Sequence, residues 1–388
     1  MGPLTATQPK PLLPVAGKPI IEHICSSLFK AGIKNVTLVI GWKKNALMDW
    51  MESSQWSSKM DYVIQKEQMG TAHAIQVVED RMDGPFLCLN GDVLTTSKDI
   101  KDMIKLHDKK HCIIGLSKVN DIRNFGEITV SDGKVTGIHE KPERKGPGLA
   151  NAGVYLFPHS IFKELSKLKP SIRGELEVVD AFIAMKPLAH ELTMWKEIGA
   201  PWDLLNVHED LMKDIKTDIK GEVEEHVTIK GQVVVKEGAV VKSGAYLVGP
   251  IFIDEGADVG PNCLIRGATY IGKNAKVGSS VEVKNSIIMD DTKLPHFNYL
   301  GDSVLGRNIN MGAGTKVANL RLDNKNVYVL LNGKRLDTGR RKFGVIIGDN
   351  VKTGINASLN VGTVVGENTF LGPGAVIKGH IEADSRVY

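Results

Sequence analysis

Residues 223–260 read VEEHVTIKGQVVVKEGAVVKSGAYLVGPIFIDEGADVG, and this stretch decides the fold of the second half of the chain. Here and beyond it an apolar residue recurs at every sixth position, at Val223, Ile229, Val235, Val241, Leu247, Ile253, Val259, Ile265, Ile271, Val277, Val283 and Met289. The spacing resumes at Tyr299, Leu305, Met311 and Val317, and again at Ile347, Thr353, Leu359, Val365, Leu371 and Ile377. Neither a helix nor a flat strand has a period of six, whereas a coil with three flat sides points one residue inward per side and turn. The repeat therefore predicts a parallel β-helix.

Composition places the chain among ordinary globular proteins. It has 388 residues, of which 42% are hydrophobic and 24% charged, and this length has room for two domains. The net charge is +4 and Lys and Arg are scattered, so we expect no nucleic acid as a partner. No apolar run approaches ~20 residues and no signal peptide is visible, so we expect no membrane span. Four separated cysteines without metal or redox spacing are typical of reduced thiols in a cytoplasmic protein.

The first half alternates helical and strand patterns. We expect helices at Lys18–Ala31, Thr71–Arg81, Ile100–His107 and Pro201–Ile215, and strands at Val36–Ile40, Phe86–Leu89 and Cys112–Leu116. A further antiparallel or mixed set is expected at Glu127–Val130, Lys134–His139 and Ala152–Phe157. Strands that alternate with helices predict an α/β domain with a mainly parallel, Rossmann-like sheet. Polar residues near 216–222 form a hinge, so we divide the chain into domains 1–216 and 217–388.

One segment of the second half, Leu320–Lys342, breaks the period of six. It is rich in Lys and Arg and contains the pair Asn332-Gly333, which suits a type I′ turn between two strands. We expect a hairpin that projects from the coil. Such a loop either carries function or is a tolerated insertion.

Short motifs in the first half resemble those of sugar-1-phosphate nucleotidylyltransferases. They are Gln8-Pro9-Lys10-Pro11-Leu12-Leu13-Pro14-Val15, Gln65-Lys66-Glu67-Gln68-Met69-Gly70-Thr71, Asn90-Gly91-Asp92, Gly126, Glu140-Lys141-Pro142 and Asn151-Ala152-Gly153. Each is weak alone, but six in the family's order make a specific match across nearly the whole first half. The resemblance implies that a sugar-1-phosphate attacks the α-phosphorus of UTP or dTTP with the help of Mg²⁺, and that pyrophosphate leaves.

The resemblance also assigns roles to residues of this chain. Asp92, at the carboxyl end of a strand, would bind Mg²⁺, with Glu197 as the second metal ligand and Asp203 behind it. Lys10 would contact the phosphates. Lys10 and Asp92 each also have a simpler interpretation: Lys10 could be a solvated loop lysine and Asp92 a turn former. His73, within the second motif, could be a packing or capping residue. The other assignments are Gln65, Gln68, Gly70 and Thr71 for the base, Gly126, Glu140 and Asn151 for the sugar, and Lys141 for its phosphate.

The family opens with a strand and a Gly-rich loop that ends in a basic residue, just before the Pro-Leu-Thr that stands here at Pro3–Thr5. This sequence starts at Met1-Gly2-Pro3, without that strand, loop and Arg. We therefore expect the chain as written to be impaired in nucleotidyl transfer.

In the second half, Arg266 and Lys284 are eighteen residues apart, which is one full coil. We expect them to stack on one edge, ~5 Å apart. Because stacked cations repel, a bound phosphate would explain the pair, the alternative being two solvated edge residues. The period of six slips at 295–302, a segment that contains His296 and Tyr299, and Asn310-Met311-Gly312-Ala313-Gly314-Thr315 and Asn319 follow.

These residues and their spacings resemble the acetyltransferase half of bifunctional glucosamine-1-phosphate acetyltransferase/N-acetylglucosamine-1-phosphate uridyltransferases, in the archaeal form. The resemblance implies a left-handed β-helix of hexapeptide repeats, acetyl-CoA as co-substrate and a homotrimer with sites between subunits. His296 would take a proton from the sugar amine, and the Ala313 N–H would stabilise the oxyanion. The remaining implied contacts are Arg266, Lys284, Tyr299 and Asn310 with the amino-sugar phosphate, Asn319 with the sugar or acetyl group, and Lys325, Lys334, Arg340 or Arg341 with the phosphates of CoA.

Three functions are compatible with this pattern. The first is a bifunctional enzyme of UDP-N-acetylglucosamine biosynthesis, and the second is an acetyltransferase whose first domain is inactive. The third is a non-catalytic regulatory subunit that binds sugar nucleotides. The third function is disfavoured by His296, Tyr299, Asn310 and Asn319, because a regulatory tail has no need of them.

Overall fold

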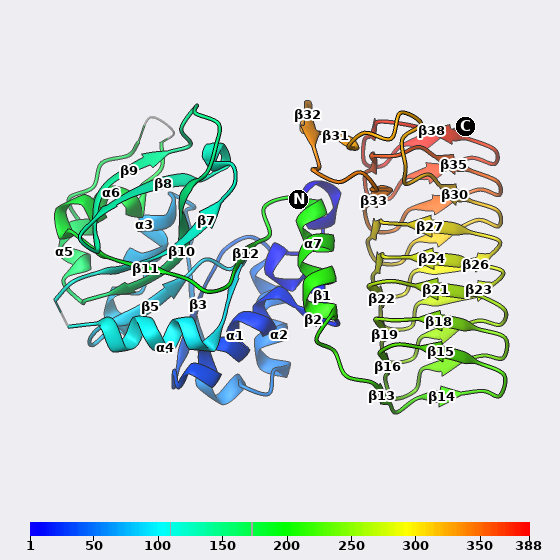
Figure 1. Cartoon of the computed structure of the whole chain (residues 1–388), viewed down its shortest axis with the longest axis horizontal. Helices are drawn as coiled ribbons and strands as arrows, with labels where there is room; N and C mark the ends of the chain where they lie inside the picture. The colour runs from blue at the N-terminus through cyan, green and yellow to red at the C-terminus, as the bar shows by residue number, and fades with distance from the viewer. Residues whose placement is uncertain (109, 172–173) are drawn as a thin grey trace. The chain divides into compact units, whose positions relative to one another are not determined.

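The computed structural model describes residues 1–108, 110–171 and 174–388 (Figure 1). It divides into two compact units, one made of Ile20–Glu197 and the other of Met1–Pro19 together with Ile198–Tyr388. The first residues of the chain thus belong to the unit that contains the repeats. The domain boundary between 216 and 217 stays a prediction.

The unit Ile20–Glu197 mixes helices and strands. Its helices are α1 (Ile20–Ala31), α2 (Lys44–Ser53), α3 (Thr71–Gln76), α4 (Ser97–Leu106), α5 (Ile161–Leu165) and α6 (Val178–Met185), with single 3₁₀ turns η3 (Ser57–Lys59), η4 (Glu79–Arg81) and η5 (Ile122–Asn124). Its strands are β3 (Val36–Ile40), β4 (Met60–Ile64), β5 (Phe86–Leu89), β6 (Val93–Thr95), β7 (Ile113–Val119), β8 (Gly126–Ser131), β9 (Lys134–Glu140), β10 (Gly148–Phe157), β11 (Leu188–Glu191) and β12 (Trp195–Glu197). In α1, Ile20, Ile24 and Leu28 are buried at helical spacing, and the helix ends before Gly32, whose φ is +102°.

The sheets of this unit confirm the predicted α/β class, but their pairing is more mixed than we expected. Six strands pair in the order β5-β10-β7-β11-β9-β8. Within this sheet β7 and β11 run parallel, and the other neighbours are antiparallel. β3 and β4 form a separate parallel pair, and β6 pairs with β12. Short hairpin-like returns such as β8 to β9 leave no room for a crossover helix, and this makes those pairs antiparallel.

The repeats form a parallel β-helix with three faces (Figure 1). One face consists of β13 (Asp218–Ile219), β16 (Val233–Val235), β19 (Ile251–Ile253), β22 (Thr269–Ile271), β25 (Ile287–Ile288), β28 (Val304–Leu305), β33 (Val345–Ile347), β36 (Thr363–Val365) and β39 (His380–Ile381). The second consists of β14 (Glu222–Val223), β17 (Val240–Val241), β20 (Asp258–Val259), β23 (Lys276–Ser279), β26 (Lys293–His296), β29 (Asn310–Met311), β34 (Lys352–Thr353), β37 (Phe370–Leu371) and β40 (Arg386–Val387). The third consists of β15 (Thr228–Lys230), β18 (Tyr246–Val248), β21 (Leu264–Arg266), β24 (Glu282–Lys284), β27 (Tyr299–Gly301), β30 (Lys316–Val317), β35 (Ser358–Leu359) and β38 (Val376–Ile377). The left-handed sense stays a prediction.

The core of the β-helix follows the predicted period of six at most positions. Ile229 is 37% exposed and lies outside the core, and two further positions are shifted by one residue. Met289 and Tyr299 were expected to point inward, but the core contains their neighbours Ile288 and Leu300 instead. The reason is a change in coil length. Arg266 pairs with Lys284, eighteen residues on, whereas Tyr270 pairs with Ile287, seventeen residues on. Two steps between inward residues are five residues long instead of six. The step from Val283 to Ile288 puts Ile288 inward in place of Met289, and the step from Leu300 to Leu305 puts Leu300 inward in place of Tyr299.

The basic insertion forms the predicted hairpin. Its strands are β31 (Tyr328–Leu331) and β32 (Lys334–Asp337), which pair antiparallel. Asn332 and Gly333 join them, both with positive φ, as a type I′ turn requires. A bridge between Leu320 and Lys342 closes the base of the loop.

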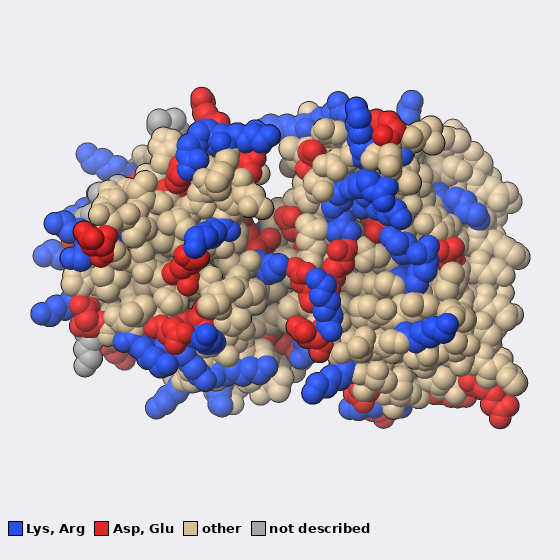
Figure 2. Space-filling view, in the orientation of Figure 1, with Lys and Arg blue, Asp and Glu red and all other residues tan. Residues whose placement is uncertain are grey.

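The remaining elements of this unit are η1 (Gly2–Thr5), η2 (Lys10–Leu12), β1 (Pro14–Val15), β2 (Lys18–Pro19) and helix α7 (Pro201–Met212). They pack on the β-helix within the unit. A Cβ on Gly17 would lie 2.5 Å from the ring of Phe252, and Thr7 donates a hydrogen bond to Asp349. Lys and Arg are distributed over the visible face of both units, with Asp and Glu among them (Figure 2). In the described part of the chain, no helix is long and apolar enough to cross a membrane.

Candidate active sites

The two predicted metal ligands lie at the ends of two paired strands, with Asp92 directly before β6 and Glu197 at the end of β12. β12 pairs with β6 so that Glu197 is opposite Val93, the residue that follows Asp92. Both carboxylates are half-buried. Among the described residues no three His, Cys, Asp or Glu side chains are grouped as a metal site. Two carboxylates nevertheless fit Mg²⁺, which takes one or two protein carboxylates and fills its other positions with water and substrate phosphate oxygens.

Asp203, the alternative candidate for the second metal ligand, stabilises the start of α7. One of its carboxylate oxygens accepts hydrogen bonds from the N–H groups of Gly199 at 3.1 Å and Ala200 at 2.7 Å. Burial raises the pKa of Asp203, against the opposing effect of these bonds. The contacts identify Asp203 as the cap of α7.

The structure brings together three of the residues predicted to hold the sugar. Gly126 pairs with Glu140 between β8 and β9. A Cβ on Gly126 would lie 2.8 Å from a Glu140 carboxylate oxygen and 3.7 Å from Cβ of Asn151. Lys141 directly follows Glu140 and is exposed. Glycine at 126 thus leaves space beside a carboxylate and an amide, groups that bind sugar hydroxyls.

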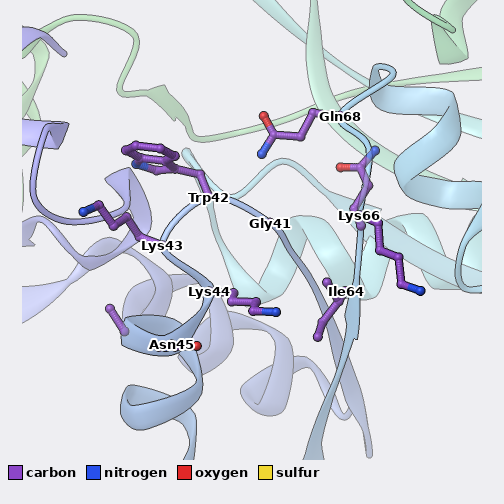
Figure 3. Close-up of a pocket in the computed structure, with 10 residues that line it drawn as sticks. Gly41, Trp42, Lys43, Lys44, Asn45, Ile64, Lys66 and Gln68 are labelled. Atoms are coloured by element: carbon purple, nitrogen blue, oxygen red, sulfur yellow. The ribbon is translucent and has the colours of Figure 1, made fainter.

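The predicted base-reading segment lies at the carboxyl ends of the parallel strands β3 and β4, where open α/β sheets bind ligands. A cavity of about 610 Å³ opens there (Figure 3). It is lined by Gly41, Trp42, Lys43, Lys44, Asn45, Ala46, Ile64, Gln65, Lys66 and Gln68. The Nε2 atom of Gln68 would lie 2.8 Å from a Cβ on Gly41, so this amide packs across the β3 loop.

Gly70 and Thr71 also have structural tasks that the sequence did not reveal. Gly70 has a φ of +107°, and a Cβ there would lie 2.6 Å from the carbonyl oxygen of Leu176. The Thr71 hydroxyl accepts a hydrogen bond from the N–H of Val178 at 3.1 Å. The Nε2 atom of Gln65 lies within hydrogen-bond distance of Nδ1 of His73, at 3.1 Å. Lys10 begins η2 in the other unit, and its phosphate role stays a prediction.

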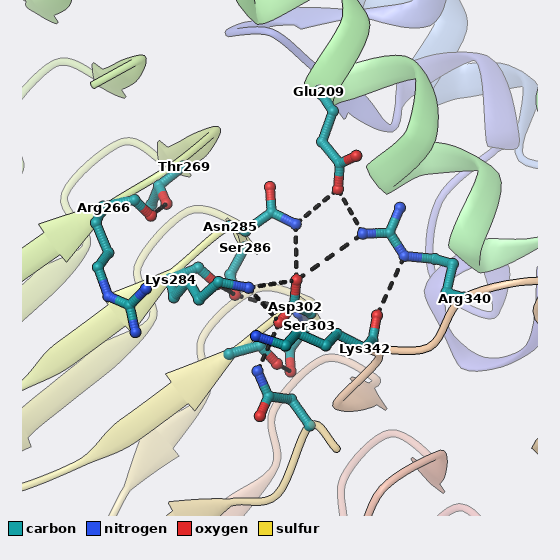
Figure 4. Close-up of polar contacts among 12 residues, drawn as sticks. Glu209, Arg266, Thr269, Lys284, Asn285, Ser286, Asp302, Ser303, Arg340 and Lys342 are labelled. Atoms are coloured by element: carbon teal, nitrogen blue, oxygen red, sulfur yellow. Dashed lines mark hydrogen bonds and ion pairs between the residues drawn. The ribbon is translucent and has the colours of Figure 1, made fainter. Parts of the chain in front are cut away.

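On the β-helix, Arg266 and Lys284 are register partners on β21 and β24, as the spacing predicted. Repulsion between the two cations does not require a bound phosphate, because each cation has its own carboxylate. Arg266 donates two hydrogen bonds to Glu282, at 3.0 and 2.8 Å. Lys284 contacts both oxygens of Asp302, at 3.0 and 2.8 Å, as Figure 4 shows. Neither acidic partner was predicted from the sequence, although Glu282 stands two residues before Lys284.

Tyr299 and Asn319 lie next to these cations. Tyr299 pairs with Glu282 on the adjacent strand, and Asn319 donates a hydrogen bond of 2.6 Å to Asp302. Both side chains lie above Gly301, where a Cβ would be 2.5 Å from Nδ2 of Asn319 and 2.9 Å from the Tyr299 hydroxyl. Burial and the nearby carboxylates of Glu282 and Asp302 raise the pKa of Tyr299, so this hydroxyl stays protonated at neutral pH.

His296 and Ala313 lie together at the end of the neighbouring face. The N–H of Gly314 donates to the carbonyl oxygen of His296 at 3.0 Å. The imidazole is exposed, and within the described part of the chain the Ala313 N–H has no acceptor. Asn310 is separate, since it begins β29 and pairs with Lys293 at the far end of β26. The coil thus brings Arg266, Lys284, Tyr299 and Asn319 together on one face but leaves Asn310 outside that group.

Each half of the chain matches a known protein family. Residues 1–214 match the nucleotidyl transferase family, and residues 247–366 match the GMPPB C-terminal domain. A structure described as a glucose-1-phosphate thymidylyltransferase from Bacillus anthracis superposes with a TM-score of 0.50 at 25% identity, and covers 56% of this chain and 92% of that chain.

Two archaeal relatives match this chain over nearly its whole length. The chain is 40% identical over 395 residues to the bifunctional protein GlmU of Methanocaldococcus jannaschii, which is all of this chain and 94% of the relative. It is 37% identical over 385 residues to the bifunctional sugar-1-phosphate nucleotidylyltransferase/acetyltransferase of Sulfurisphaera tokodaii, which is 97% of this chain and 93% of the relative.

Proposed function

Because the chain belongs to the family of bifunctional sugar-1-phosphate nucleotidylyltransferase/acetyltransferases, we propose that it supplies UDP-activated N-acetyl amino sugars in two reactions. In the first, an acetyl group passes from acetyl-CoA to glucosamine-1-phosphate or galactosamine-1-phosphate. In the second, UTP or dTTP gives its nucleotidyl group to the N-acetylated product, and pyrophosphate leaves. The observation that carries the proposal is the cluster of Arg266, Lys284, Tyr299 and Asn319 on three successive coils and the loop that follows.

In acetyl transfer, the sugar amine attacks the thioester carbonyl of acetyl-CoA. His296 takes the proton that the amine loses, and the CoA thiolate leaves. The Ala313 N–H, which has no acceptor among the described residues, donates to the oxyanion that forms in between. Arg266 and Lys284 hold the phosphate, and Tyr299, protonated at neutral pH, donates to the sugar.

In nucleotidyl transfer, the phosphate oxygen of the sugar attacks the α-phosphorus, so the protein's task is positioning and charge neutralisation. Asp92 and Glu197 are the residues that would hold Mg²⁺, and the metal would neutralise the phosphate charge. Gln65 and Gln68, beside the cavity at the ends of β3 and β4, hold the base. Glu140 and Asn151 bind the sugar hydroxyls around the space left by Gly126, while Lys141 contacts the sugar phosphate.

The separation of Asn310 from the other ligands supports a homotrimer. Asn310 lies at the start of β29, on a different face from Lys284 and Tyr299. In a trimer of parallel β-helices this amide would reach the site of a neighbouring copy.

The four cysteines are free thiols, and burial raises the pKa of Cys88 and Cys263 to about 12, which fits a reducing, cytoplasmic setting.

The direct test measures both products of the purified chain. Thiol release from acetyl-CoA is followed with glucosamine-1-phosphate and galactosamine-1-phosphate, and pyrophosphate release from UTP and dTTP is followed with the N-acetylated sugar phosphates in the presence and absence of Mg²⁺. The proposal expects sugar-dependent release of CoA and metal-dependent release of pyrophosphate. CoA release that does not depend on the amino-sugar phosphate would refute the acetyltransferase assignment.

A further inference from the structure

Asp302 is a buried carboxylate at the centre of the β-helix cluster. It follows β27 at a corner of the coil, and its side chain is 3% exposed. It contacts the ammonium group of Lys284 and accepts hydrogen bonds from the Nδ2 atoms of Asn285 at 2.9 Å and Asn319 at 2.6 Å (Figure 4). A buried carboxylate is stable only when it is paired and hydrogen-bonded, and these contacts meet that need.

These contacts fix how Lys284 and Asn319 present themselves to a ligand. An ammonium group has three N–H donors, and two of those on Lys284 are directed to the two oxygens of Asp302. The third is left for a phosphate oxygen. A carboxylate only accepts, so it holds the Nδ2 side of Asn319 toward itself and turns the carbonyl oxygen away. That oxygen is then placed to accept an N–H from an amino sugar.

The basic insertion reaches the same cluster through Arg340. Its guanidinium lies 3.9 Å from Asp302 and forms an ion pair with Glu209 of α7, and it also donates to Asn206 at 2.5 Å. Asn285 donates to Glu209 at 2.6 Å and so joins the two carboxylates. The Arg340 side chain is 13% exposed, which commits it to this cluster instead of to the phosphates of CoA. Two cations thus balance two carboxylates.

We infer that Asp302 is a positioning residue for acetyl transfer, and that the insertion acts as a strap that holds this carboxylate in place through Arg340 and Glu209. The inference rests on the proposed acetyl transfer and adds a role for the insertion, with an amino-sugar phosphate as the ligand. Asp302 touches no reacting atom. It acts through Lys284 and Asn319, and Arg340 keeps the Asp302 carboxylate from turning toward Lys284 alone.

The test compares Asp302→Asn with the full-length wild-type chain. An amide at 302 has no charge and one acceptor oxygen in place of two, so it cannot accept from both Asn285 and Asn319 while it also pairs with Lys284. We expect the Kd for glucosamine-1-phosphate, measured by calorimetry without acetyl-CoA, and the KM for this sugar to rise about tenfold, while the KM for acetyl-CoA is unchanged. Asp349→Asn is the matched control, because Asp349 is a buried carboxylate paired with Arg307 on the same β-helix. We expect it to change neither constant.

Two further variants keep the test decisive if Asp302→Asn folds poorly. Glu209 is more exposed, and we expect Glu209→Gln to raise the Kd for the sugar phosphate about threefold. We expect Arg340→Ala to do the same, with Arg321→Ala as the control within the insertion. In the Asn319→Ala background, the effect of Asp302→Asn is expected to shrink, because its route through Asn319 is gone.

The outcomes distinguish a failure of the proposed acetyl transfer from a failure of the positioning role of Asp302. If the wild-type chain neither binds glucosamine-1-phosphate nor releases CoA with it, the proposed acetyl transfer fails. If the wild-type chain is active but Asp302→Asn, Glu209→Gln and Arg340→Ala all leave the Kd for the sugar phosphate unchanged, the positioning role is refuted. Equal effects of Asp302→Asn and Asp349→Asn would likewise refute it, since they would show a purely structural role.

Discussion

Two cations of the β-helix, Arg266 and Lys284, are each paired with a carboxylate in the absence of a ligand. The guanidinium of Arg266 uses Nε and Nη2 on Glu282, and Lys284 uses two donors on Asp302. Each cation keeps donors for a second anion, since a guanidinium has five and an ammonium three. The paired carboxylates therefore hold the cations in place and leave some of their N–H donors available for a ligand. A phosphate that bridges Arg266 and Lys284 would find both already oriented.

Arg266→Ala should weaken the amino-sugar phosphate without affecting the other substrate. The variant removes a charged partner of the phosphate and leaves Glu282 to repel it, so we expect the KM for glucosamine-1-phosphate to rise about tenfold or more. The KM for acetyl-CoA should stay constant. Lys276→Ala, which breaks the ion pair with Asp258 on another face, serves as the control. An unchanged KM for the sugar phosphate in Arg266→Ala would place Arg266 outside the site.

At the scale of elements, Asp99 ties helix α4 to the segment before β12. It is fully buried and accepts hydrogen bonds from the N–H of Thr193 at 2.8 Å and the hydroxyl of Thr96 at 2.7 Å. Burial alone would raise the pKa of Asp99, but the bonds from Thr96 and Thr193 outweigh it and lower that pKa. The ionised form is therefore the one that the fold stabilises.

This contact predicts a pH dependence of stability. A carboxyl group whose pKa is lowered by folding stabilises the fold fully above its unfolded pKa of about 3.9, and the contribution is lost as pH falls through the folded value. We expect Asp99→Asn to lower the free energy of unfolding by about 1–3 kcal/mol at pH 7 and by less near pH 3. Urea denaturation at both pH values measures it, with Asp102→Asn on the exposed face of α4 as the control. An equal loss at pH 7 and pH 3 would contradict the ionic role.

The coils of the β-helix supply a second prediction about elements. Ile271 and Ile229 occupy equivalent positions in the period of six, but Ile271 is fully buried and Ile229 is 37% exposed. Ile271→Ala should cost about 2–4 kcal/mol of stability, because it leaves a cavity between coils, and Ile229→Ala should cost less than about 1 kcal/mol. Denaturant titration of both variants provides the comparison. Equal losses would mean that the two positions are equally packed.

The sequence predicted the elements better than it predicted their contacts. The period of six located the β-helix, and the Asn332-Gly333 pair located the hairpin. Tyr299 was misplaced because one missing residue in a coil shifts the inward position, and a change of register cannot be seen from spacing until the partner strand is known. Asp302 was missed because its partners Lys284, Asn319 and Arg340 come from three different parts of the chain.

At the scale of the whole molecule, each of the two proposed reactions uses residues of a different compact unit. Asp92, Glu197 and the sugar-binding residues lie within Ile20–Glu197, whereas His296 and the β-helix cluster lie in the other unit. The account's central claim is that the chain carries two separate sites, each with its own essential residue.

The most direct test assays His296→Ala and Asp92→Ala side by side, with release of CoA and release of pyrophosphate measured on each protein. The account predicts that His296→Ala lowers the kcat for CoA release by about 10²–10⁴-fold and leaves pyrophosphate release intact, and that Asp92→Ala does the reverse. His226→Ala, an exposed histidine on the β-helix, is the control and should change neither rate. Loss of both activities in His296→Ala, with the fold intact, would contradict the claim of two separate sites.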